Sequence, residues 1–159
     1  MVFETIYQTY WNKIFRLCRG YLGDDDWAKD VAQDSFVSVY NNLGKFRGEA
    51  SVGTWIYKIA VNNCLRQIEK DKKLQKSGVP ENIPEPPEID NQPQIDLLYK
   101  FISELKELDR IVISLELEDI RQAEIAQITG LSEANVRVKI HRIKEQLLKK
   151  FQTHGHDRS

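Results

Sequence analysis

The chain has little of what marks secreted or membrane proteins. Only two of its 159 residues are cysteines, Cys18 and Cys64, and each lies within an apolar helical pattern. We therefore expect buried free thiols in a reducing compartment rather than a disulfide or a metal site. No apolar run approaches the length of a membrane span, and no signal peptide is visible. These absences predict a cytoplasmic protein without membrane insertion.

Catalytic signatures are also missing. The sequence contains no glycine-rich phosphate-binding loop, no metal-ligand cluster and no nucleophile motif, so we expect no enzymatic activity, no cofactor and no metal. Two segments offer remote metal-binding alternatives. The aspartates at 24–26 lack the alternating ligands and central glycine of a calcium loop, and we expect them to cap the following helix. His154 and His156 lie in a polar terminal stretch that we expect to be disordered.

Proline is confined to one part of the chain, because all five prolines lie between residues 80 and 93. Proline cannot continue a helix and disfavours helical geometry in the residue before it. The stretch between Val79 and Tyr99 also carries five acidic residues and no basic one. The sequence therefore predicts a flexible acidic linker over residues 77–93.

Net charge divides along the chain in the same way. Residues 1–78 carry a net charge of +3, residues 79–119 carry −8, and residues 120–159 carry +4. The whole-chain charge of −1 therefore hides two basic ends that suit an acidic partner such as nucleic acid.

Apolar residues recur with helical spacing on both sides of the linker. We expect an all-α protein of two small helical domains, with the following divisions: a first domain at 1–76, the linker at 77–93, a second domain at 94–151, and a tail at 152–159. Three helices are expected before the linker, at 2–22, 26–42 and 51–73. In the second domain a helix resumes near Gln94, and we expect Asp109 to cap a short helix that ends at Leu115.

Residues 121–148 have the pattern of a helix-turn-helix. Gly130 suits the left-handed turn that ends the first helix, and Ser132 can cap the second. In that second helix an apolar seam leaves a basic outer face that fits the major groove of DNA, formed by Arg137, Val138, Lys139, His141 and Arg142. Val138 suits contact with a thymine methyl group. The same pattern also fits a structural helical hairpin whose basic face is merely solvated.

Taken together, several segments resemble one known family over nearly the whole chain. They are the aromatic residues Phe3, Tyr7 and Tyr10, followed by segments 28–36, 45–48, 54–62, 108–110, 124–126 and 135–142. Their order and spacing resemble the extracytoplasmic-function (ECF) branch of bacterial RNA polymerase sigma factors. The resemblance implies that core RNA polymerase and promoter DNA are partners, and that an anti-sigma factor holds the protein inactive.

The resemblance also implies roles for individual residues. Asp30 and Gln33 would lie on the helix that meets the polymerase clamp. The loop at 45–51 would hold a base flipped out of the opened strand, with Phe46, Arg47 and Trp55 contacting that DNA. An aromatic face beside a cation suits single-stranded DNA, although Phe46 and Trp55 fit a buried core equally well.

The second-domain helix would read or approach the minus-thirty-five element. Arg137 or Arg142 would pair with guanine through two hydrogen bonds, and Lys139 would contact a phosphate group. The sequence thus predicts a sigma factor that directs promoter-specific initiation. The alternative is a stand-alone helix-turn-helix regulator that binds duplex DNA as a dimer without polymerase.

Overall fold

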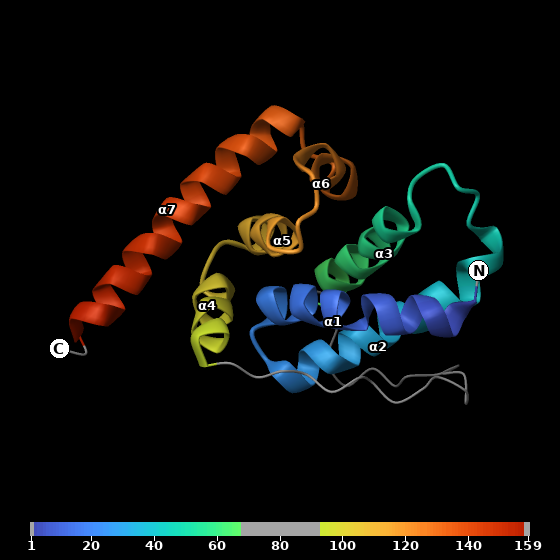
Figure 1. Ribbon diagram of the computed structural model, residues 1–159, viewed down its shortest axis with the longest axis horizontal. Helices are drawn as coiled ribbons and strands as arrows, with labels where there is room; N and C mark the ends of the chain where they lie inside the picture. Colours follow the sequence, from blue (N-terminus) through green and yellow to red (C-terminus); the bar gives the residue numbers. More distant parts are fainter. Residues whose placement is uncertain (1, 68–92, 158–159) are drawn as a thin grey trace.

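A computed structural model describes residues 2–67 and 93–157, and every regular element in these residues is helical (Figure 1). The first half contains α1 (Phe3–Leu22), α2 (Asp25–Asn42), a 3-10 turn η1 (Leu43–Lys45) and α3 (Val52–Gln67). The second half contains α4 (Pro93–Ser103), α5 (Glu107–Glu116), α6 (Gln122–Thr129) and α7 (Glu133–Asp157). The all-α prediction is confirmed. The predicted linker lies outside the described residues except for Pro93, which begins α4.

The ends of the first three helices follow from local sequence. Gly23 ends α1 in the left-handed region, with a φ of 73°, where a side chain would be strained. The Asp24 carboxylate then caps α2 by accepting a hydrogen bond of 2.9 Å from the Trp27 backbone N–H. Ser51 caps α3 in the same way, through a 3.1 Å bond from the Thr54 N–H. Both caps agree with the sequence prediction.

An aromatic core holds the first three helices together. The rings of Tyr7, Trp11 and Phe36 are fully buried and meet in edge-on and tilted pairs with centroids 5.0 to 5.9 Å apart. Cys18 and Cys64 lie in this core as free thiols, with their Sγ atoms 3.7 Å apart. The contact with Cys64, together with burial, raises the pKa of the Cys18 thiol well above its usual value. The predicted buried thiols are confirmed.

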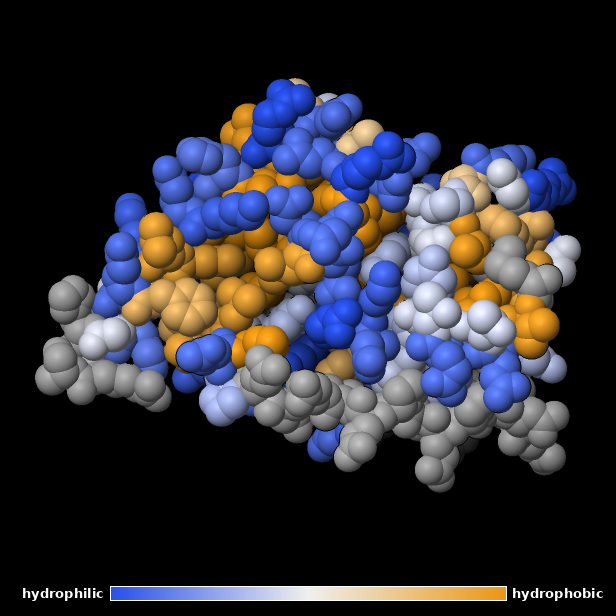
Figure 2. Space-filling view, in the orientation of Figure 1, coloured by the Kyte–Doolittle hydropathy of each residue, from blue (hydrophilic) through white to orange (hydrophobic). Residues whose placement is uncertain are grey.

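Two expectations for the second half were wrong. Asp109 does not cap α5, because the helix begins two residues earlier and Lys106 occupies its N-cap. The C-terminal stretch is also ordered further than expected, since α7 continues to Asp157. Its last turns pack on α4, where the ring of Phe151 meets that of Phe101 edge-on at 4.9 Å. Figure 2 shows apolar side chains gathered between α7 and the helices beneath it, bordered by hydrophilic residues.

The two halves of the chain pack directly on each other. Helix α1 lies against α4 and α5, and α3 lies against α6 (Figure 1). Gly20 permits the close approach of α1 and α5, because a Cβ atom at this position would lie 2.3 Å from the Ser114 hydroxyl oxygen. Arg16 of α1 also forms a two-pronged ion pair with Glu118, with both N···O distances at 2.7 Å.

Further polar contacts line the same interface. The Tyr21 hydroxyl donates to the Glu107 carboxylate at 2.6 Å, and Arg110 donates to the Tyr21 backbone carbonyl at 2.8 Å. Arg19 pairs with Asp96, and its guanidinium lies 5.2 Å from the centre of the Tyr99 ring. Burial, with a smaller contribution from Glu118, raises the pKa of Tyr99 to about 12. The interface therefore joins the halves through charge pairs as well as apolar packing.

Candidate nucleic-acid interfaces

The loop after η1 and the start of α3 form a pocket of about 300 Å³. Phe46 and Trp55 provide its aromatic lining, with ring centroids 5.0 Å apart and planes inclined by 38°. Both side chains are half-buried, so each offers part of its ring surface to the pocket. Trp55 packs on the edge of the core as well, which accounts for the ambiguity of its position in the sequence.

The backbone on each side of the pocket is fixed by local bonds. The Phe46 N–H donates to the Leu43 carbonyl at 3.3 Å and closes the 3-10 turn. Gly48 takes a left-handed φ of 74°, which turns the loop toward the Ser51 cap of α3. These bonds hold Phe46 beside Trp55, although the two residues are nine positions apart in sequence.

The charge around the pocket is mainly positive. Lys45, Arg47 and Lys58 line it together with a single acidic residue from the loop, Glu49. An aromatic floor surrounded by cations suits a base of single-stranded DNA, because the base stacks on a ring and its phosphates meet the positive charges. The structure thus brings together the three predicted pocket residues Phe46, Arg47 and Trp55.

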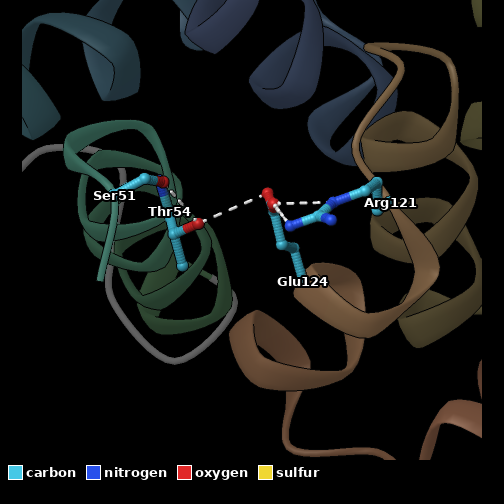
Figure 3. Close-up of polar contacts among 4 residues, drawn as sticks. All are labelled: Ser51, Thr54, Arg121 and Glu124. Carbon is cyan, nitrogen blue, oxygen red and sulfur yellow. Dashed lines mark hydrogen bonds and ion pairs between the residues drawn. The ribbon is translucent and has the colours of Figure 1, made fainter. Parts of the chain in front are cut away.

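The second half of the chain reaches the same pocket through α6. Gln127 is part of the pocket wall, and the Thr54 hydroxyl donates to the Glu124 carboxylate at 3.5 Å (Figure 3). Arg121 holds the other oxygen of Glu124 through bonds of 3.2 and 2.8 Å. The sequence did not indicate Glu124 or Gln127 as neighbours of the pocket, because they are more than sixty residues from it along the chain.

The helix-turn-helix has the predicted geometry. Gly130 ends α6 with a φ of 81°, and Ser132 caps α7 through a 3.1 Å bond from the Asn135 N–H. The predicted apolar seam of α7 is buried and consists of Val136, Ile140, Ile143 and Leu147. On the other side, Arg137 and His141 are exposed, and Val138 is 65% exposed. An exposed apolar side chain at this position remains available for a methyl contact.

Two of the predicted DNA contacts of α7 are held by α5. Lys139 Nζ lies 3.2 Å from Asp109 Oδ1, and Arg142 Nη2 lies 3.1 Å from both oxygens of the same carboxylate. The Asp109 side chain is only 5% exposed, whereas that of Arg142 is 49% exposed. Asp109 was expected to cap a helix, and nothing in its local sequence indicates these contacts with α7.

The predicted polymerase-binding residues lie on α2. Asp30 is exposed and Gln33 is half-buried, on the side of the helix away from the buried residues Ala28, Ala32 and Phe36. Within residues 2–67 and 93–157 no three His, Cys, Asp or Glu side chains are grouped in a way that could hold a metal. No helix in this part of the chain is long and apolar enough to cross a membrane.

The fold and its two basic surfaces define an all-α, DNA-binding protein with a helix-turn-helix. Comparison with known proteins narrows this class. Residues 6–74 match Sigma-70 region 2, and residues 95–147 match Sigma-70 region 4. The chain is 30% identical over 155 residues to the RNA polymerase sigma factor YlaC of Bacillus subtilis, covering 92% of this chain and 90% of that one. It is 29% identical to the ECF sigma factor SigW of the same organism, covering 94% and 88%.

The chain belongs to the ECF family of RNA polymerase sigma factors. It therefore directs promoter-specific transcription initiation by binding core RNA polymerase and promoter DNA. A solved structure of CnrH in complex with the cytosolic domain of CnrY shares the fold, with a TM-score of 0.68 at 18% identity, covering 95% of this chain and 88% of that one.

Proposed function

We propose that the pocket at Phe46 and Trp55 captures one base of the opened promoter strand, and that α7 reads duplex DNA further upstream. The observation that carries this division is the pocket itself, in which two half-buried rings and three cations surround a space of about 300 Å³. Duplex DNA presents its bases edge-on and stacked, so a pocket of this kind suits a base that has left the stack.

The roles within α7 follow from exposure. Arg137, Val138 and His141 face solvent near the start of the helix, which is the part that enters the major groove in helix-turn-helix proteins. Arg142 keeps half of its side chain exposed, whereas the Lys139 ammonium pairs with Asp109, so in our proposal Lys139 adds positive charge near the phosphates. The two readouts are joined in one chain, so each raises the effective concentration of the other at a promoter.

Besides promoter DNA, the proposed partners are proteins. In our proposal the exposed side of α2, with Asp30 and Gln33, contacts core polymerase in the cytoplasm, and the chain contributes no catalytic group of its own. The domain boundaries follow the sequence division, with region 2 at 1–76 and region 4 at 94–151. The structure of CnrH with the cytosolic domain of CnrY supports a protein partner for this chain as well, which we propose to be an anti-sigma factor.

Run-off transcription with purified bacterial core RNA polymerase tests the proposal on a library of genomic promoters. We expect discrete start sites that depend on the added protein and share two spaced motifs. Phe46→Ala and Trp55→Ala should each lower the yield of open complexes by about tenfold or more, because stacking on an aromatic ring is worth roughly 1–3 kcal/mol per base. Leu148→Ala, which truncates an exposed apolar side chain outside both surfaces, is the control.

Two results would contradict the proposal in different ways. Full open-complex yield with both aromatic variants would show that the pocket does not hold a base. Specific binding to duplex DNA without polymerase, and no stimulation of transcription with it, would instead indicate a stand-alone regulator.

A further inference from the structure

Asp109 is the buried centre of a three-residue charge cluster that joins α5 to α7. Its carboxylate accepts from Lys139 at 3.2 Å and from Arg142 at 3.1 Å, and its side chain is 5% exposed. A carboxylate buried to this extent loses most of its contacts with water, and the two cations that hold it replace those contacts. Both cations come from α7, three positions apart on the same flank of the helix.

The two cations differ in what remains available to a ligand. Lys139 is 19% exposed, and its single ammonium group is already directed at Asp109. Arg142 is 49% exposed and contacts the carboxylate through Nη2 alone, so Nη1 and Nε are not used by Asp109. A guanidinium presents several donors in a rigid plane, and fixing one of its nitrogens limits the directions of the others.

We propose that Asp109 is a specificity-determining positioning residue, which fixes Arg142 of α7 in the orientation that reads a base in the upstream promoter element. Lys139 braces the same carboxylate and contributes charge. An exposed arginine on a helix otherwise samples many rotamers and loses that freedom when it binds a base edge. Asp109 orders the side chain beforehand, so the free protein already presents the remaining donors toward DNA. The inference rests on the proposed function of α7.

A second pair of charges between the same helices provides a matched comparison. Glu116 of α5 accepts from Lys144 of α7 at 2.9 Å, on the opposite flank of α7 from Arg142. Its side chain is 20% exposed and Lys144 is 57% exposed. Glu116→Gln therefore removes the same charge from the same helix pair without changing the contacts of Arg142.

The test uses the full chain assembled with core RNA polymerase and a promoter library randomised in the upstream element. Open complexes are sequenced at several salt concentrations. For Asp109→Asn we expect discrimination at one base position to fall by about 5- to 10-fold. Total DNA binding should not fall with it, and the slope of log affinity against log salt should steepen by about one, because one negative charge is lost.

Three further variants separate positioning from stability. Arg142→Ala should remove discrimination at the same base position, and adding Asp109→Asn to it should cause no further loss there. Asp109→Glu keeps the charge but moves it by one methylene, so discrimination should fall while the salt slope stays unchanged. If Asp109→Asn fails to fold, Asp109→Glu provides the test of positioning in its place. Glu116→Gln should retain the full base preference.

Specific results would overturn the inference. The first is an unchanged base preference in Asp109→Asn or Asp109→Glu. The second is an equal loss of base discrimination at every position, together with a lower melting temperature. The third is a further loss of discrimination when Asp109→Asn is added to Arg142→Ala. Failure of the proposed function has a different signature, because the unmodified protein would then give no discrete start sites with polymerase.

Discussion

At the scale of single residues, Glu118 is a carboxylate that the interface between the two halves buries. Its side chain is 5% exposed, and the Arg16 guanidinium meets both of its oxygens in a side-on arrangement. A buried ion pair contributes little to the stability of the fold when compared with apolar residues of similar size. Removing one partner is nevertheless costly, because the other charge remains buried with neither water nor a counter-charge. The pair therefore makes the packing of the two halves sensitive to either side chain.

We expect Arg16→Met to lower the free energy of unfolding by about 3 kcal/mol, because Glu118 would remain buried without its partner. The double variant Arg16→Met/Glu118→Gln should recover at least half of that loss, since the unpaired charge is gone. Urea unfolding followed by far-ultraviolet circular dichroism measures both. If Arg16→Met unfolds at the same urea concentration as the unmodified chain, the ion pair does not hold the interface.

At the scale of elements, the crossing of α1 and α5 depends on the absence of one side chain. Gly20 lies inside α1, where glycine normally weakens a helix relative to alanine by roughly 1 kcal/mol. A Cβ atom here would lie 2.3 Å from Ser114 Oγ and 3.4 Å from Ile102 Cγ2. Helix α1 thus contains a residue of low helix propensity at the position where close packing against α5 requires the absence of a side chain.

Gly20→Ala should consequently destabilise the protein despite the better helix propensity of alanine, lowering the melting temperature by several degrees. Ser114→Ala removes the hydroxyl that the new Cβ meets, and the next atoms lie at ordinary contact distances. The pair Gly20→Ala/Ser114→Ala should then be at least as stable as the unmodified chain. Differential scanning calorimetry measures both melting temperatures, and a stabilising single Gly20→Ala would show that the Ser114 hydroxyl rotates away from the new Cβ.

The helices themselves were predictable because their signals are local. Gly23, Ser51, Gly130 and Ser132 all mark helix ends within a few residues of the bonds they make. Asp109 was misread for the opposite reason. Its sequence context is that of a cap, but its partners Lys139 and Arg142 are 30 and 33 residues away.

The candidate sites could also be predicted only in part, because some of their residues come from distant parts of the sequence. The resemblance to the family assigned Phe46, Arg47 and Trp55 to the same DNA contact, and in the structure all three line one pocket. Gln127 completes that pocket from α6, and only the packing of one half on the other brings it there. Likewise, the polar C-terminal stretch was expected to be disordered because nothing local indicates that the His154 ring would meet Phe101 of α4 edge-on.

At the scale of the whole molecule, the packed halves place an acidic residue beside the predicted base pocket. Glu124 accepts from Thr54 at the start of α3 (Figure 3). Gln127 of the same helix forms part of the pocket wall. Arg121 pairs with the Glu124 carboxylate, so α6 adds little net charge here, but α6 closes one side of the pocket to an approaching DNA strand. Separation of α6 from α3 should therefore make the pocket a better site for single-stranded DNA.

Gly20→Leu tests this by forcing α1 away from α5, since a larger side chain cannot fit against Ser114. We expect its radius of gyration by small-angle X-ray scattering to rise, and its affinity for a fluorescent single-stranded oligonucleotide to increase by about fivefold or more. Glu124→Gln should raise that affinity by a smaller factor at an unchanged radius, because it removes the charge but leaves α6 in place. Trp55→Ala in the Gly20→Leu chain should abolish the gain. An expanded chain whose oligonucleotide affinity matches that of the closed one would mean that α6 does not restrict the pocket.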